Sequence, residues 1–158
     1  MKKLLIVKFA FVIVFGAVAC KSVSRGAMQE NVTEQQTGDI IEKYWKLTEL
    51  RGNPVTFQGD DFNRTPHFVL KTDESRVIGH GGCNSFTGVY EVDFAAGRIK
   101  FSQMIATMMA CIDMEVEQEL LRVFEMADNY SLSDDGKILS LNRARMAPLA
   151  RFEVEYLR

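Results

Sequence analysis

Apolar and polar residues alternate in a series of short segments, and this period of two constrains the fold more than any other feature. Trp45 and Leu47 show it early in the chain, and Phe152, Val154 and Tyr156 show it near the end. Successive side chains of a strand point to opposite faces, so the alternation predicts strands with one buried face. The strands we expect span residues 44–50, 55–57, 67–70, 77–79, 86–92, 98–101, 130–132, 137–141 and 149–156.

One segment departs from this period. In 114–127, Val116, Leu120, Val123 and Phe124 recur at helical spacing, with glutamates expected on the opposite face and Asp113 placed to cap the N-terminus. Turn residues such as Asp134-Asp135-Gly136 separate the expected strands and favour antiparallel hairpins. We therefore predict a mainly β (α+β) fold, an antiparallel, partly open β-barrel of about seven or eight strands with one packed amphipathic helix.

The N-terminus has the pattern of an export signal. Lys2 and Lys3 precede an apolar run from Leu4 to Val18, which is short for a permanent membrane helix. The run ends at Ala17-Val18-Ala19-Cys20, which favours a lipobox with Cys20 lipidated, although Ala17 replaces the usual Leu and ordinary signal-peptidase cleavage is the alternative. We expect a signal peptide over 1–19, the lipidated Cys20 and a polar flexible tether over 20–38, and one folded domain over 39–158.

Charge and composition limit the partners. The chain is 47% hydrophobic and 25% charged, which is ordinary for a globular domain. Removal of 1–19 deletes three of the 19 basic residues and leaves 16 against 21 acidic ones, a net charge of about −5. No basic run is present, so nucleic acid is not an expected partner. Lys21 after Cys20 favours the outer membrane, facing the periplasm, as the location of a monomeric, lipid-anchored protein.

Two cysteines remain beyond Cys20. Cys83 and Cys111 would lie in an oxidising compartment, where an even count suggests one disulfide. It would close a loop of about 29 residues and stabilise the fold by roughly 3–4 kcal/mol. The alternative is two buried thiols that act as small apolar residues.

Several strings resemble a known family. Gly82-Cys83-Asn84 leads into Phe86, Gly88 and Tyr90, and a second string, Thr107 to Cys111, contains Met108 and Met109. With Trp45-Lys46-Leu47 near the start, they resemble the META domain, the family of the heat-shock lipoprotein HslJ. The resemblance implies a cracked antiparallel barrel with one helix, similar to secretion-pilot lipoproteins. It also implies a protein of the cell envelope, in a family linked to heat induction, antibiotic tolerance or secretion and without an agreed enzymatic activity.

Glycines surround the first string at positions 79, 81, 82 and 88. They favour a tight turn between strands, with Asn84 bonding nearby backbone; a ligand-binding loop is the alternative. Trp45, Thr107, Met108 and Met109 are candidates for either core or ligand contacts.

Other chemistries have weaker patterns. Cys83 with His80 or His67 could form a thiol enzyme or a zinc site, but the spacing implies neither geometry. Four methionines, 104, 108, 109 and 114, could bind Cu(I), although methionine also fills irregular gaps in a core. We therefore expect no metal, no cofactor and no catalytic residue.

Two further groups could form binding surfaces. The aromatic residues favour a plain core over a lipid or peptide groove; they are Trp45, Phe57, Phe68, Phe86, Tyr90, Phe101, Phe124, Phe152 and Tyr156. Arg143, Arg145, Arg151 and Arg158 are expected on a solvated face, with a docking patch as the alternative. The function we expect is a non-enzymatic envelope lipoprotein that binds another envelope protein through an exposed strand edge and acts in the envelope stress response, in assembly or in secretion. A carrier of a small hydrophobic ligand is the second hypothesis, and a Cys/His enzyme or copper protein the third.

Overall fold

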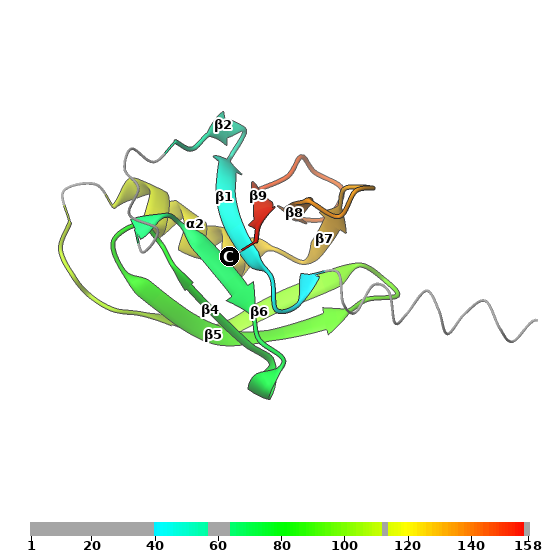
Figure 1. Cartoon of the computed structure of the whole chain (residues 1–158), viewed down its shortest axis with the longest axis horizontal. Coiled ribbons are helices and arrows are strands. Elements are labelled where there is room, and N and C mark those ends of the chain that lie inside the picture. The colour runs from blue at the N-terminus through cyan, green and yellow to red at the C-terminus, as the bar shows by residue number, and fades with distance from the viewer. Residues whose placement is uncertain (1–39, 57–63, 112–113, 157–158) are drawn as a thin grey trace, which may run out of the picture.

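The computed structural model describes residues 40–56, 64–111 and 114–156. Strands dominate it, and one α-helix, α2 (Glu115–Met126), lies behind them (Figure 1). A short 3-10 helix, η2 (Asp73–Ser75), joins two of the strands. The strands are β1 (Tyr44–Leu50), β2 (Asn53–Pro54), β3 (His67–Leu70), β4 (Arg76–His80), β5 (Ser85–Asp93), β6 (Arg98–Ala106), β7 (Asn129–Leu132), β8 (Ile138–Asn142) and β9 (Ala150–Glu155).

The strands form a nine-stranded antiparallel sheet that closes into a ring. Each strand from β3 to β8 pairs with the next along the chain, and β1 pairs with both β3 and β9. The pairing is weakest between β6 and β7, where the register contains one pair, Arg98 with Asn129. The predicted mainly β fold with one helix is confirmed, and its form is a ring-like sheet.

The ring is filled by aromatic side chains. Phe124 of α2 lies with its ring centroid 5.4 Å from that of Phe68 and 4.8 Å from that of Phe101, both edge-on. Phe68 also meets Phe152 of β9 at 4.8 Å. Helix α2 therefore buries its apolar face inside the sheet, as the sequence pattern predicts.

Three strand predictions were wrong in detail. The hairpin strand expected at 55–57 lies at Asn53–Pro54 instead, and Phe57 lies outside the described residues. β6 runs to Ala106, five residues beyond the expected end at Phe101. Tyr156 does not share the buried face of Phe152 and Val154, because β9 ends at Glu155 and the Tyr156 side chain is 70% exposed.

A bulge explains the unexpected course of β6. The pairing with β5 shifts between Thr87 and Val89, and Gln103 on the opposite strand has φ of +51°. An extra residue in one strand reverses which face the following side chains occupy. Ile99 and Phe101 therefore point inward, whereas Ile105 points outward and is 67% exposed.

The helix also differs from its expected pattern. Glu117, placed by the helical period among the solvated glutamates, is only 4% exposed. Met114 occupies the N-cap position without a side-chain hydrogen bond, and Asp113, the predicted cap, lies outside the described residues. Among the residues described, no helix has the length and apolar character needed to cross a membrane.

Candidate functional site

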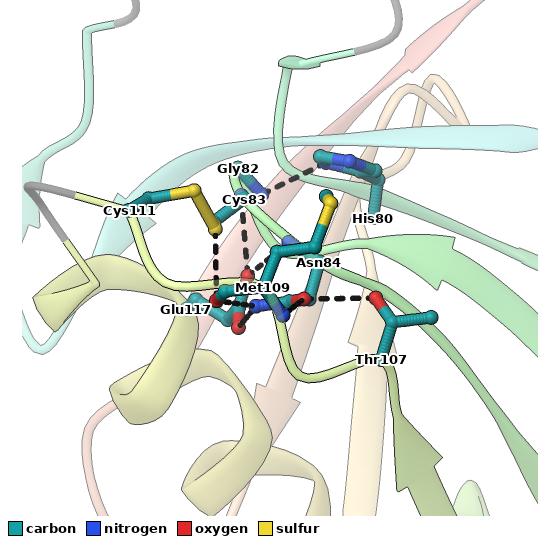
Figure 2. Close-up of a disulfide and its surroundings, with 8 residues drawn as sticks. All are labelled: His80, Gly82, Cys83, Asn84, Thr107, Met109, Cys111 and Glu117. Carbon is teal, nitrogen blue, oxygen red and sulfur yellow. Dashed lines mark hydrogen bonds between the residues drawn. A yellow bond between two sulfur atoms is a disulfide. The ribbon is translucent and has the colours of Figure 1, made fainter.

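Three segments distant in sequence meet at one end of the sheet. They are the turn from Gly81 to Asn84 between β4 and β5, the segment 107–111 after β6, and the first turn of α2 (Figure 2). Polar side chains and a disulfide join them. We call this group, formed by Cys83, Asn84, Thr107, Met109, Cys111 and Glu117, the clamp.

Glu117 is the buried acceptor of the clamp. Its Oε2 accepts the backbone N–H of Cys83 at 3.1 Å and that of Asn84 at 2.5 Å. Its Oε1 accepts the side-chain N–H of Asn84 at 2.7 Å. A buried carboxylate is costly unless hydrogen bonds replace its water. These three donors supply that replacement and fix α2 to the β4–β5 turn.

Asn84 is the centre of the clamp. Its Oδ1 accepts the Thr107 hydroxyl at 2.8 Å and the Met109 backbone N–H at 2.7 Å. Its Nδ2 donates to the Met109 carbonyl at 3.2 Å as well as to Glu117. The expected bond to nearby backbone is wrong, because the groups that bond to the Asn84 side chain, including the Met109 backbone, lie 23 to 33 residues away. The amide acts as a cross-brace between segments.

A disulfide closes the same site covalently. Cys83 and Cys111 are bonded, with their Cα atoms 6.1 Å apart. Cys83 is buried at 5% exposure, whereas Cys111 is exposed. The bonded Cys83 sulfur carries no proton and offers no thiolate nucleophile, so the arrangement shown does not support the Cys/His enzyme hypothesis.

The glycines permit close approach at the clamp. A Cβ at Gly81 would lie 2.4 Å from Glu117 Cγ, and one at Gly79 would lie 2.3 Å from the His67 carbonyl oxygen. Gly82 has φ of +113°, a conformation that L side chains rarely adopt. Glu117 already accepts the N–H groups of Cys83 and Asn84, so these donors are not available to a ligand. The turn therefore anchors α2 to the sheet, and the arrangement does not favour a ligand-binding loop.

Two histidines lie beside the turn as a cross-strand pair. His80 Nδ1 accepts the Gly82 N–H at 3.0 Å, and His67 Nδ1 lies 2.7 Å from the Thr65 carbonyl oxygen. Tyr44 stacks on His67 at 4.2 Å. Burial lowers the pKa of His67, the Thr65 hydrogen bond opposes that shift, and the electrostatic interaction with a protonated His80 would add to the lowering. Burial likewise raises the pKa of Tyr44.

Metal-binding groups do not converge in the described ranges. No cluster of three or more His, Cys, Asp or Glu side chains there could hold a metal ion. Met104 packs against the core, whereas Met108 and Met109 lie on the surface. The methionines therefore occupy different environments, which does not favour the copper hypothesis.

The candidate core and ligand residues divide between interior and surface. Trp45 is fully buried, and its Nε1 donates to the Ile40 carbonyl at 2.9 Å. Met108 is 98% exposed and Met109 56% exposed, which corrects the expectation that they contribute to a core or an enclosed ligand site. Phe86 and Tyr90 are buried, so the aromatic residues of the described strands mostly form core.

An exposed apolar surface emerges beside the clamp. Ile78 on β4 is opposite Thr87 on β5, which is opposite Ile105 on β6. Met108, 98% exposed, follows two residues after the end of β6, next to Thr107, whose N–H donates to the Ser85 carbonyl at 3.0 Å. We call Ile78, Thr87, Ile105 and Met108 the apolar platform. The sequence could not reveal it, because the outward position of Ile105 depends on the β6 bulge.

The arginines do not gather at this surface. Arg143 and Arg145 are exposed in the connection between β8 and β9, and Arg151 Nη1 lies 2.7 Å from Glu49 Oε2. Arg158 lies outside the described residues. Cys20 and the expected tether also lie outside them.

Comparison with known proteins identifies the family. The META domain matches residues 38–156, which covers every described strand and α2. The chain belongs to the META domain family. The clamp therefore explains why the two strings that resemble META, Gly82-Cys83-Asn84 and Thr107 to Cys111, occur together: their residues bond to one another.

Solved structures share the fold of this META domain. One is a protein from Burkholderia xenovorans solved by NMR, 18% identical, with a TM-score of 0.56, covering 76% of this chain and 88% of its own. Another NMR structure is also 18% identical, with a TM-score of 0.53, covering 71% of this chain and 88% of its own. No curated protein matches the chain significantly.

Proposed function

We propose that this chain is a lipid-anchored envelope protein whose META domain binds another envelope protein and catalyses no reaction. The observation that carries the proposal is the apolar platform. Ile105 and Met108 are 67% and 98% exposed, and Ile78 is 40% exposed. Exposed apolar side chains that lie together on a soluble domain mark interaction sites.

The clamp gives this surface a fixed shape. Asn84 accepts the Met109 N–H and the Thr107 hydroxyl, which belong to the residues on either side of Met108. The disulfide fixes the same segment at Cys111. A preorganised surface loses less conformational entropy when a partner binds. Such an arrangement supports binding by displayed side chains on a rigid support.

The platform is also uncharged. Its neighbours along β5 and β6 include Ser85 and Thr107. Charged residues lie farther along the strands, with exposed Arg76 two residues before Ile78 on β4, and Glu91 opposite Lys100 on β5 and β6. An uncharged apolar surface favours a partner with apolar side chains at its contact. We place binding on this exposed face of the sheet and not, as the sequence analysis expected, on a strand edge, because the exposed apolar side chains lie on the face.

Site-specific photo-crosslinking in intact cells tests the binding proposal. A photoreactive residue at position 108 is expected to capture a defined partner, whereas one at Met146, 68% exposed between β8 and β9, is not. Ile105→Asp is expected to reduce capture at position 108 at least tenfold, because a charge enters the apolar contact. Equal capture at 108 and 146, or capture that Ile105→Asp leaves unchanged, would contradict the proposal.

The anchor is tested separately. We propose that Cys20 carries the lipid and that the protein lies on the outer membrane, facing the periplasm. Cys20→Ser is expected to abolish incorporation of radiolabelled fatty acid and to release the chain from the membrane fraction. Incorporation equal to that of the unaltered protein would exclude Cys20 as the lipidated residue.

A further inference from the structure

His80 connects the two-histidine pair to the clamp. Its Nδ1 accepts the Gly82 N–H at 3.0 Å (Figure 2), and a ring nitrogen accepts a hydrogen bond only when it carries no proton. Gly82 directly precedes Cys83 and Asn84, whose N–H groups donate to Glu117. The protonation state of one side chain is therefore tied to the start of the clamp.

Among the residues that the structure describes, titratable groups near the histidine pair lie on β3, β1, β9 and α2. His67 on β3 is its cross-strand partner, with parallel rings at a centroid distance of 6.4 Å. Behind His67 lie Tyr44 of β1 and the carboxylate of Glu155 on β9, which Lys46 approaches at 3.7 Å. On the other side of the turn lies the carboxyl group of Glu117 on α2, whose side chain packs against Gly81.

This environment separates the two histidines. Burial lowers the pKa of His67, and a charge on His80 opposes a second proton nearby. Burial therefore disfavours protonation of His67. His80 has its Nδ1 directed at a backbone N–H, so it is the member whose protonation has a structural consequence.

We infer that His80 is an acid-sensitive latch for the clamp. When Nδ1 takes a proton from solvent, its lone pair is no longer available and Gly82 N–H loses its acceptor. The turn then holds Asn84 less firmly, and Asn84 is the residue that fixes Met109 and Thr107 beside the platform. The consequence for binding rests on the proposed function, whereas the acid response of the turn needs no partner.

Amide hydrogen exchange followed by NMR tests the latch in the purified protein. Histidine ordinarily titrates near pH 6.5, so a change from pH 7.5 to pH 5.5 crosses that range. After correction for the intrinsic pH dependence of exchange, protection of the Gly82 amide is expected to fall roughly tenfold, and protection in β8 to stay unchanged. Equal protection of Gly82 at both pH values would overturn the inference.

Two variants assign the effect to one ring. His80→Asn keeps an oxygen acceptor that does not titrate and that can accept an N–H two residues ahead, so Gly82 is expected to stay protected at both pH values. His67→Gln is expected to retain the full pH response. A fall in His80→Asn equal to that in the unaltered protein, or loss of the response in His67→Gln, would contradict the latch.

Crosslinking separates this inference from the proposed function. If both hold, capture at position 108 is strong at pH 7.5, weaker at pH 5.5, and strong at both pH values in His80→Asn. Capture that is absent at pH 7.5 contradicts the binding proposal and leaves the exchange result standing. Capture that is equal at both pH values contradicts acid control of binding.

Discussion

At the scale of single residues, Glu117 decides whether the clamp holds. Glu117→Gln keeps the size of the side chain but replaces one acceptor oxygen by a donor, which would face either backbone N–H groups or the Asn84 amide. A buried donor without a partner costs about 1–3 kcal/mol. We expect urea unfolding to show a loss of stability of that size.

Glu119→Gln is the matched control on the same helix. Glu119 bonds to Arg51 and Arg122 on the surface, and its pKa is lowered by those hydrogen bonds. Exposed ion pairs contribute about 0–1 kcal/mol, so we expect the Glu119→Gln variant to lose little stability. If both variants unfolded at the same urea concentration, the clamp would not contribute to stability as described.

His67 gives a second residue-scale prediction, for pH. Its pKa is lowered in the folded state, so the unfolded chain binds the proton more readily. The stability associated with neutral His67 is therefore present above about pH 6.5 and falls as pH decreases through that value. Calorimetry of the His67→Phe variant, which keeps a ring for Tyr44 to stack on, is expected to show a smaller fall in Tm between pH 7.5 and pH 5.5. If Tm changed with pH in this variant as it does in the unaltered protein, His67 would not contribute to the pH dependence of stability.

At the scale of elements, the bulge in β6 sets the surface. It depends on Gly88, where a Cβ would lie 2.4 Å from Met104 Sδ and 3.0 Å from the Ser102 carbonyl oxygen. Gly88→Ala is expected to destabilise the domain by about 1–3 kcal/mol through overpacking. Met104→Ala in the same chain should recover part of that loss, because the nearer clash is with a side chain. Chemical denaturation of both single variants and the double variant measures their unfolding free energies. If the two losses of stability were strictly additive, Met104 would not be the group that obstructs a Cβ at position 88.

At the scale of the whole molecule, the disulfide ties the β4–β5 turn to the segment that leads into α2. Opening it frees a loop with a sequence separation of 28 residues, and the expected loss of stability is roughly 3–4 kcal/mol. Guanidinium unfolding with and without reductant measures it. In the Cys111→Ser variant, reductant should change nothing; a shift in that variant would mean that the reductant acts elsewhere.

Patterns with a fixed period could be read from the sequence alone. The alternation at Trp45 and Leu47 and the helical spacing of Leu120, Val123 and Phe124 predicted the strands, the helix and their buried faces. The prediction of paired cysteines used only their count and compartment, and the structure joins them. These features depend on near neighbours in sequence or on composition. A single sequence was therefore enough to predict them.

Tertiary structure decided the clamp and the platform. Glu117 lies among glutamates that look solvated by period, and it is buried only because Cys83 and Asn84, more than thirty residues earlier, present their N–H groups to it. Ile105 faces outward because one extra residue in β6 reverses the alternation after Gln103. Hydrogen bonds between distant segments and shifts of strand register leave no periodic trace in a single sequence, so the surface proposed for binding became visible only in the fold.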